Sequence, residues 1–249
     1  RLSDRRKGIG GDGVILIHPS KVADARMQMF NLDGSEGKMC GNGIRCVGKY
    51  IYDHGIAKKP VVTVETLSGI KTLELTVENG KATAARVDMG APILTPEKIP
   101  TTLCAGQAQA VDVPLAAAGK EWRVTCVSMG NPHCVIFVQE DPMALDLEKI
   151  GPEFEHHPAF PEDVNTEFVQ VLDATHLNMR VWERGSGETM ACGTGATATA
   201  VAAVLNGISP KNEDITVHLR GGDLIIRVTG ETAYMTGEAV EVFEGTVEV

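Results

Sequence analysis

The chain has 249 residues, of which 43% are hydrophobic, and its formal net charge is -10 at pH 7. This length allows one large domain or two smaller ones, each with its own core. Because nucleic-acid binding needs a basic patch and the basic residues here are scattered, we expect no nucleic-acid partner. The apolar stretches are too short to span a bilayer, so we expect no membrane partner either.

Short strands are predicted along most of the chain, where β-branched or alternating runs are separated by Gly, Asn or Lys. They cover residues 14–17, 26–30, 61–65, 70–77 and 82–88, and later 123–128, 134–138, 166–171, 178–182, 215–219 and 224–228. Two segments break this rhythm and predict helices, at 44–54 and 196–205. Each follows a glycine and ends before a glycine or Asn-Gly.

Two irregular segments interrupt the pattern. Residues 92–100 hold three of the twelve prolines and predict a domain junction. Residues 151–161, which contain Pro and His, predict a loop. We therefore expect a first domain at 1–90 plus 237–249 and a second at 91–236.

The two predicted helices share an entrance. Cys40-Gly41-Asn42-Gly43 opens the first, and Cys192-Gly193-Thr194-Gly195 opens the second. One such motif alone would be interpreted as an ordinary tight turn. Two, each led by Cys and followed by a helix, indicate a weak internal repeat. Two similar domains facing each other would bring both helix starts to one cleft.

The six cysteines indicate neither a metal site nor a disulfide framework. No two have Cys-x-x-Cys spacing, and the chain is long, with no visible secretory signal. Cys46, Cys104, Cys126 and Cys134 are interpreted as small buried hydrophobic residues. Cys40 and Cys192 are the exceptions.

A helix amino terminus suggests a chemistry for these two cysteines. Its unpaired N–H groups and positive dipole bind a carboxylate and favour a thiolate over a thiol. Inverting a stereocentre next to a carboxylate requires a base on one face and an acid on the other. Cys40 and Cys192 can supply both, so the sequence predicts an amino-acid racemase or epimerase without a cofactor.

Other polar residues fit around this centre. Glu183 precedes the second cysteine and is predicted to bind a substrate ammonium, with Arg184 beside it binding a carboxylate in bidentate fashion. By itself the Glu-Arg pair would be interpreted as a solvated ion pair. His133 stays ambiguous between a turn residue and a catalyst.

At these residues the chain closely resembles the diaminopimelate epimerase family, over nearly its whole length. The matching motifs are Gly8–Gly13, Phe30–Glu36, Met39–Gly43, Met129–Cys134 and Trp182–Gly195. The resemblance implies an α/β (α+β type) fold of two pseudo-symmetric, strand-rich domains, each wrapped around a central helix. It implies interconversion of LL- and meso-2,6-diaminopimelate without metal or pyridoxal phosphate, in lysine and peptidoglycan-precursor biosynthesis. A cytoplasmic homodimer is expected (or a plastid stromal enzyme in a plant).

The resemblance also implies a role for each matching residue. Cys40 and Cys192 would be the acid–base pair, and Glu183 would hold the α-amino group. His133 would be an auxiliary residue near the cysteines. Backbone N–H groups of the helix starts would hold the reacting carboxylate, at Gly41, Asn42, Gly43, Gly193 and Thr194. Polar side chains would grip the distal end of the substrate, namely Asn31, Asn131, Asn165 and Arg184.

Two departures and two rival interpretations accompany this resemblance. Family members usually begin with a further strand-and-helix segment whose asparagine touches substrate, and some carry glutamine where Gly13 stands. The nearest rival is a two-cysteine racemase of proline or histidine, but such enzymes typically have His in place of Asn42. A rival of another class is a catalytically silent amino-acid-binding protein, which both cysteines argue against.

Overall fold

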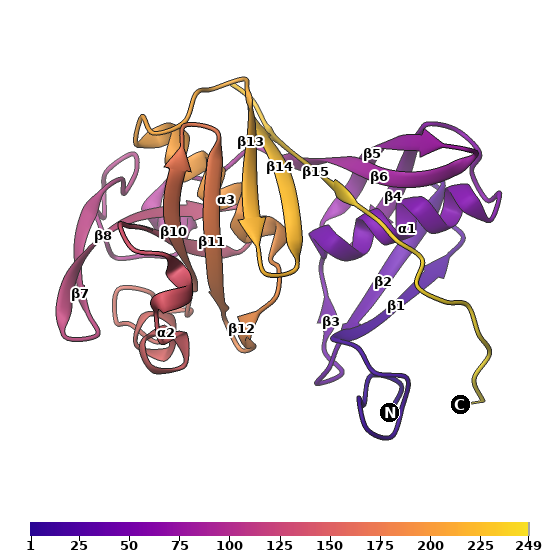
Figure 1. The fold of residues 1–249 in the computed structure, drawn as a ribbon, viewed down its shortest axis with the longest axis horizontal. Helices are drawn as coiled ribbons and strands as arrows, with labels where there is room; N and C mark the ends of the chain where they lie inside the picture. The colour runs from indigo at the N-terminus through magenta and orange to yellow at the C-terminus, as the bar shows by residue number, and fades with distance from the viewer. Residues whose placement is uncertain (249) are drawn as a thin grey trace. The chain divides into compact units, whose positions relative to one another are not determined.

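The computed structural model describes residues 1–248 and divides into two compact units (Figure 1). Unit 1 comprises Arg1–Asp88 and the segment from Thr236 onward, and unit 2 comprises Met89–Met235. These boundaries lie within two residues of those expected from the sequence. Val249, the last residue of the expected first domain, lies outside the described residues. That each unit is an independent domain stays a prediction.

Unit 1 places one helix on a strand-rich layer. Its elements are β1 (Gly13–His18), β2 (Ala25–Asn31), β3 (Glu36–Gly37), α1 (Gly41–Asp53), β4 (Val61–Thr66), β5 (Gly69–Glu78) and β6 (Lys81–Gly90). The strand order is β1-β2-β4-β5-β6, with β3 paired to β2. Strands β2 and β4, on either side of α1 in the chain, pair in parallel, whereas the pairs β1/β2, β2/β3, β4/β5 and β5/β6 are antiparallel. Helix α1 buries Ile44, Val47 and Ile51 against β2, β4 and β5.

Unit 2 is larger and has two helices of more than one turn among its described residues. Its elements are β7 (Val113–Ala117), β8 (Lys120–Ser128), β9 (Pro132–Val138), α2 (Leu147–Glu155), β10 (Asn165–Asp173), β11 (His176–Glu183), β12 (Gly187–Thr189), α3 (Gly193–Leu205), β13 (Asp214–Leu219) and β14 (Gly222–Val228). The 3-10 turns η1 (Pro96–Lys98) and η2 (Pro142–Ala144) lie between them. The order is β14-β13-β11-β10-β9-β8-β7, with β12 paired to β11. Strand β15 (Ala233–Glu238) leads from unit 2 back into unit 1.

The internal repeat is present in the topology. In unit 1 the antiparallel pair β1/β2 is followed by a short β3 on β2, then by α1, and then by β4 parallel to β2. In unit 2 the pair β10/β11 is followed by β12 on β11, then by α3, and then by β13 parallel to β11. Both helices have 13 residues. The pseudo-symmetric, strand-rich fold predicted from the sequence is therefore confirmed.

Helix α3 lies at the centre of unit 2, behind β11 and β13 in Figure 1. Every residue from Ala196 to Ala203 is buried, and the helix contacts β8, β9, β10, β13 and β14. Side chains as small as Ala and Thr let strands approach the helix from several sides. Both predicted helices are confirmed, and each begins three residues earlier than expected because its cysteine provides the cap.

One segment folds differently from the prediction. Residues 151–155 belong to α2, although a loop was expected over 151–161 because that segment contains Pro and His. A Cβ on Gly151 would lie only 2.3 Å from the Trp182 ring, so this glycine lets the helix pack directly on the indole. Tertiary packing thus overrides two helix-breaking residues.

Three further expectations are corrected or refined. Cys46 is exposed, whereas it was expected to be buried, and Cys104 is only partly buried. Cys126 and Cys134 are buried as expected, and these two free cysteines lie opposite each other on the neighbouring strands β8 and β9. The proline-containing segment 92–100 lies inside unit 2, where Ile93 bridges to Ser128.

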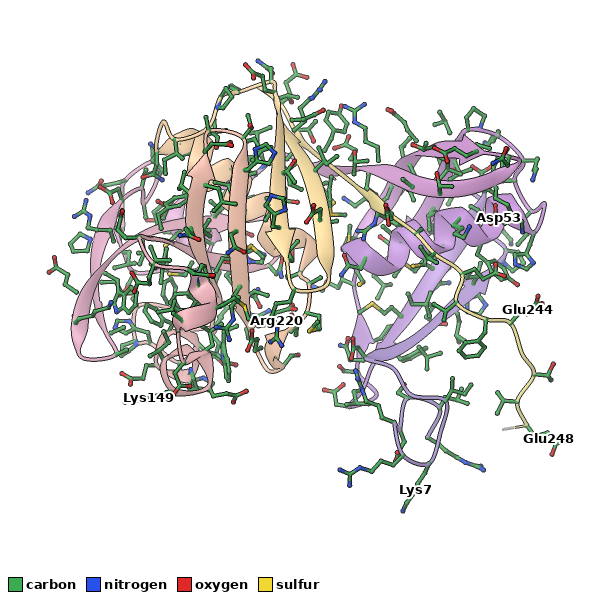
Figure 2. The ribbon with its side chains drawn as sticks, viewed as in Figure 1. Lys7, Asp53, Lys149, Arg220, Glu244 and Glu248 are labelled. Carbon is green, nitrogen blue, oxygen red and sulfur yellow. The ribbon has the colours of Figure 1, made fainter. Side chains whose placement is uncertain are left out.

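Asp53 at the end of α1 (Figure 2) is predicted to stabilise unit 1. Its fully buried carboxylate accepts bonds from Lys49 Nζ at 2.8 Å and from the Ala82 N–H at 2.9 Å. Burial acts to raise the pKa of Asp53, but these bonds and the Lys49 and Lys81 charges hold it below its ordinary value. Asp53→Asn should cost about 1.5–3 kcal/mol of unfolding free energy at neutral pH, typical of a lost charged hydrogen bond.

The pH dependence of that loss follows from the sign of the shift. A depressed carboxyl pKa stabilises the fold above the unfolded value of about 3.9, and the stabilisation disappears as the pH falls through the folded value. Urea unfolding at pH 7 and at pH 3 should therefore show a difference between wild type and Asp53→Asn that shrinks in acid. Glu78→Gln, at an exposed position of β5, is the control. An equal difference at both pH values would contradict the assignment.

Candidate active site

Cys40 is the N-cap of α1. It has extended backbone angles, φ -132° and ψ 119°, and its sulfur accepts the N–H of Gly43 at 3.3 Å. Cys192 is the N-cap of α3 with φ -126° and ψ 111°, and its sulfur accepts the N–H of Gly195 at 3.4 Å. Sulfur thus takes the place that a Ser or Asp oxygen usually has at a helix start. The two cysteines occupy equivalent positions of the repeat.

The charges around the two helix starts differ. In unit 1 the Arg45 guanidinium is largely buried within the first turns of α1. It donates to the Gly41 carbonyl at 3.0 Å and to Asn42 Oδ1 at 3.1 Å. In unit 2 the carboxylate of Glu183 acts on Cys192 instead. One sulfur therefore lies near a cation and the other near an anion.

Burial raises the pKa of the Cys192 thiol well above its ordinary value, and the charge of Glu183 raises it further. The Thr194 hydroxyl and the Gly195 N–H lower it, but by less. The general expectation that a helix start depresses the thiol pKa is therefore wrong for Cys192. A helix dipole contributes about 0.3–1 kcal/mol, whereas removing an ion from water costs several.

Glu183 and Arg184 leave the end of β11 in a turn that unit 2 holds in place. The Glu183 carboxylate accepts the Thr189 hydroxyl of β12. Arg184 is exposed, and its guanidinium donates to the Glu162 carbonyl at 2.8 Å. Its backbone N–H donates to Asn165 Oδ1 at 2.9 Å, and Asn165 Nδ2 donates to the Pro132 carbonyl at 2.9 Å. Asn165 therefore ties the turn to β9 with one donor and one acceptor.

Two carboxylates outside the predicted site brace the same turn. Glu155 of α2 accepts the Gly185 N–H at 2.6 Å and the Trp182 indole N–H at 2.7 Å. The Glu188 carboxylate of β12 accepts a hydrogen bond from Arg180 and pairs with Arg220, each at 2.8 Å (Figure 2 labels Arg220). These contacts hold the pKa of Glu188 below its ordinary value. The segment that leads from β11 to Cys192 is thus held in place by Glu155 at its start and by Glu188 further along.

Asn31 ends β2, the strand of unit 1 that corresponds to β11. Its Nδ2 donates to Ser35 Oγ at 3.0 Å within the turn that leads to β3. Together with Val14, Phe30 and the segment 1–6, it lines a cavity of about 740 Å³. Asn31 and Glu183 therefore occupy equivalent strand ends, each ten residues before the first residue of its helix.

Asn131 and His133 are joined to the Cys192 helix within unit 2. Asn131 Nδ2 donates to Thr194 Oγ1 at 3.3 Å, and Asn131 Oδ1 lies 3.1 Å from His133 Nε2. His133 is fully buried in β9, so its interpretation as a turn residue is wrong. Its Nδ1 lies 2.7 Å from Oε1 of Glu167, which is also fully buried.

Sequence reasoning missed the residues that hold the site from behind: Arg45, Glu155, Glu167 and Glu188. Glu167 precedes the apolar residues Phe168 and Val169 of β10, and a carboxylate beside such residues is a usable signal. The signal was obscured because β10 is buried on both faces from Asn165 to Val169, so no alternation marks its inward side.

Potential metal ligands gather in one place among residues 1–248. Glu155, His156 and Asp163 lie within ligand distance of one another, and His156 Nδ1 is 3.1 Å from Asp163 Oδ1. Both carboxylate oxygens of Glu155 already accept hydrogen bonds from the 182–185 turn. The cluster is therefore better explained as support for that turn.

Comparisons with known proteins cover most of the chain, including the candidate site residues. The sequence model of the diaminopimelate epimerase family matches residues 1–95 and 125–242. A diaminopimelate epimerase from Acetivibrio thermocellus is 57% identical over 251 residues, covering 100% of this chain and 88% of that protein. One from Agathobacter rectalis is 52% identical over 255 residues, with the same coverage of both chains.

Solved structures of lower identity share the fold. A hydroxyproline epimerase from Agrobacterium vitis superposes with a TM-score of 0.70 at 17% identity, covering 96% of this chain and 74% of that one. A phenazine biosynthesis protein of the PhzF family from Bacillus anthracis gives 0.68 at 18% identity, covering 96% and 86%. At such identities the likeness concerns the fold alone.

Proposed function

Because the chain belongs to the diaminopimelate epimerase family, we propose that it performs that reaction with Cys40 and Cys192 as its acid–base pair. The enzyme is an isomerase that interconverts LL- and meso-2,6-diaminopimelate, a step of lysine and peptidoglycan-precursor biosynthesis. Its substrate is this small molecule.

The matched capping of the two helices is the observation that carries the mechanism. Each sulfur is an N-cap followed by Gly-polar-Gly, so each lies beside N–H groups that can bind a carboxylate. Inversion at the α-carbon needs a proton removed from one face and another delivered to the opposite face. Two equivalent cysteines, one from each unit, provide one group for each face.

The unequal surroundings of the sulfurs assign the resting roles. Burial and the nearby Glu183 carboxylate favour the thiol form of Cys192, so we assign it as the acid of the resting enzyme. Cys40 then takes the role of the base, as the second cysteine of the pair. When the substrate ammonium neutralises Glu183, the anion beside Cys192 is compensated, which allows the roles to be exchanged in the reverse direction.

The remaining predicted residues divide between the two ends of the substrate. We assign the reacting carboxylate to the helix starts, through N–H groups of Gly41, Asn42, Gly43, Gly193 and Thr194, where hydrogen bonds stabilise the developing enolate-like charge. Glu183 takes the α-ammonium. Asn31, Asn131, Asn165 and Arg184 take the distal amino-acid head, and His133 acts through Asn131. We propose no cofactor and no metal for this chemistry.

Location and assembly are also proposals. All six cysteines are free, which suits a reducing compartment such as the cytoplasm, or the plastid stroma in a plant. Among residues 1–248 no helix is long and apolar enough to cross a membrane. We propose a homodimer, which sedimentation at micromolar concentration should show as twice the mass of one chain.

Solvent isotope uptake tests the two-base mechanism. In heavy water, meso-diaminopimelate formed from the LL isomer in the first turnovers should carry one α-deuterium, while the remaining LL substrate keeps its hydrogen. This asymmetry arises because the group that delivers the proton is not the group that removed it. Product that retains the original α-hydrogen would instead indicate a single base, and the two-cysteine assignment would fail.

A further inference from the structure

A chain of buried and partly buried hydrogen bonds runs from the core of unit 2 to Cys192. It begins at Glu167, whose Oε1 lies 2.7 Å from His133 Nδ1, and both side chains are fully buried. On the other side of the ring, His133 Nε2 lies 3.1 Å from Asn131 Oδ1. Glu167 and His133 meet because β10 and β9 pair in parallel, with Asn165 opposite His133 in the register.

The chain continues through the first turn of α3. Asn131 Nδ2 donates to Thr194 Oγ1 at 3.3 Å, and Thr194 Oγ1 lies 3.5 Å from Cys192 Sγ. Four contacts therefore connect a buried carboxyl group to a sulfur proposed to react with substrate. Every member belongs to unit 2.

Donor and acceptor chemistry fixes a direction along this chain. Because Asn131 donates through Nδ2 to Thr194, its Oδ1 faces His133, whose Nε2 must then carry the hydrogen. His133 Nδ1 consequently shares a single proton with Glu167. At the other end, the Thr194 oxygen accepts from Asn131, so its own O–H is left to donate to the Cys192 sulfur.

We propose that Glu167 is a positioning residue: it fixes the His133 tautomer and, through Asn131, commits the Thr194 hydroxyl to donate to Cys192. A hydroxyl pointed at the sulfur stabilises the thiolate, the form that Cys192 needs when it acts as a base. The inference rests on the proposed function only in giving that thiolate a catalytic use. Glu167 touches neither the sulfur nor the substrate in this role.

Two observations support a shared, neutral Glu167–His133 pair. Burial raises the pKa of Glu167, and its Oε2 has no hydrogen-bond partner among the described residues, so a full carboxylate charge there would be poorly compensated. A neutral pair also places less negative charge near Cys192 than a separate carboxylate would. The pair then transmits orientation rather than charge.

Gly195 shows how closely Glu167 is fitted to the helix start. A Cβ on Gly195 would lie 2.7 Å from Glu167 Oε1, so a side chain there would displace the carboxyl group. Gly195 therefore leaves room for Glu167, the residue that we propose to orient the Thr194 hydroxyl.

Replacement of Glu167 by leucine removes every partner of His133 Nδ1. Either tautomer then becomes available, and the Nδ1–H form turns a bare Nε2 toward Asn131. Asn131 is expected to rotate its amide in response, which offers oxygen to Thr194 and draws the hydroxyl away from Cys192. Glu167→Gln can still donate an N–H to Nδ1, so it keeps the Nε2–H tautomer and should rescue most of the loss.

Alkylation of Cys192 by iodoacetamide measures its thiolate directly, without substrate. At a fixed pH on the rising part of the profile, Glu167→Leu should alkylate Cys192 about tenfold more slowly than wild type, the change expected for one pKa unit. Mass spectrometry of the Cys192 peptide gives the rate, and exposed Cys46 in unit 1 serves as an internal control that should not change. Glu167→Gln should stay within about threefold of wild type.

Thr194→Val tests the other end of the chain even if Glu167→Leu folds poorly. It should slow Cys192 alkylation by about the same factor, and the double variant should lose no more than either single one. Nitrogen-15 spectra should show His133 with a protonated Nε2 in wild type and Glu167→Gln, but mixed tautomers in Glu167→Leu.

Three results would overturn the proposal. One is wild-type alkylation in a folded Glu167→Leu protein, and another is a Glu167→Gln rate as low as that of Glu167→Leu. The third is fully additive losses in the double variant. Because none of these measurements uses diaminopimelate, a failure of the two-base mechanism in heavy water would be recognised separately.

Discussion

Replacing either Cys40 or Cys192 by alanine is expected to lower kcat/KM for epimerisation by about 100- to 10,000-fold, the usual contribution of one acid–base group. In the proposed mechanism each sulfur serves one face of the α-carbon, so neither can take over the work of the other. The measurement is the rate of interconversion of LL- and meso-diaminopimelate, with circular dichroism to show that both variants are folded. Serine at either position is a milder change, because a hydroxyl can donate a proton but is a poor base.

Other cysteines of the chain supply matched controls. Cys46 lies on α1 itself but is exposed, and Cys104 is a partly buried cysteine of unit 2. Alanine at either control position should leave the rate within about twofold of wild type, as expected for sites away from the reaction. Near-normal epimerisation by Cys40→Ala or Cys192→Ala would disprove the two-cysteine mechanism.

Arg184→Met is expected to reduce kcat/KM for diaminopimelate by about 100-fold or more. An unmade hydrogen bond to a charged group costs about 1.5–3 kcal/mol, and a bidentate guanidinium–carboxylate pair loses two. Lysine, which lacks only the distal carboxylate, should for the same reason be a very poor substrate of the wild-type enzyme. Exchange of the α-hydrogen for deuterium can be compared for diaminopimelate, lysine, proline and histidine in one preparation.

Two controls separate this specificity from damage to the site. Arg227→Met removes an exposed arginine of unit 2 that pairs with Asp214 at 2.7 Å, and it should leave the activity near that of wild type. Arg184→Met should also leave the alkylation rate of Cys192 unaltered, since the guanidinium lies beyond the turn that Glu155 and Asn165 brace. If lysine or proline exchanges its α-hydrogen as fast as diaminopimelate, the residues assigned to bind the distal amino-acid head do not determine specificity, and that assignment is wrong.

The surroundings of Cys192 show why local sequence is a poor guide to thiol ionisation. The position of Cys192 at the entrance to a helix was predictable from the Cys-Gly-Thr-Gly motif, whereas its role as the N-cap was seen only in the structure. The net effect depends on burial, because α3 packs among β8, β9, β10, β13 and β14, and on the carboxylate of Glu183. Burial and charge from distant residues outweigh the helix dipole at this sulfur.

Features that depend on neighbours along the chain could be predicted from the amino-acid sequence. Glycine after cysteine allows the turn that starts α1 and α3, and alternating β-branched residues specify most strands. The candidate site residues also lie in short motifs, so Cys40, Asn131, Glu183 and Arg184 could be selected from the order of residues alone.

The groups that support that site depend instead on contacts between distant parts of the chain. Helix α2 forms across Gly151 and Pro152 because its apolar side packs on the sheet and Trp182 lies against the glycine. Glu167 meets His133 because parallel pairing of β9 and β10 places two residues 34 positions apart within 2.7 Å. Such contacts depend on strand order and on burial from both faces, and neither leaves a periodic trace in the sequence.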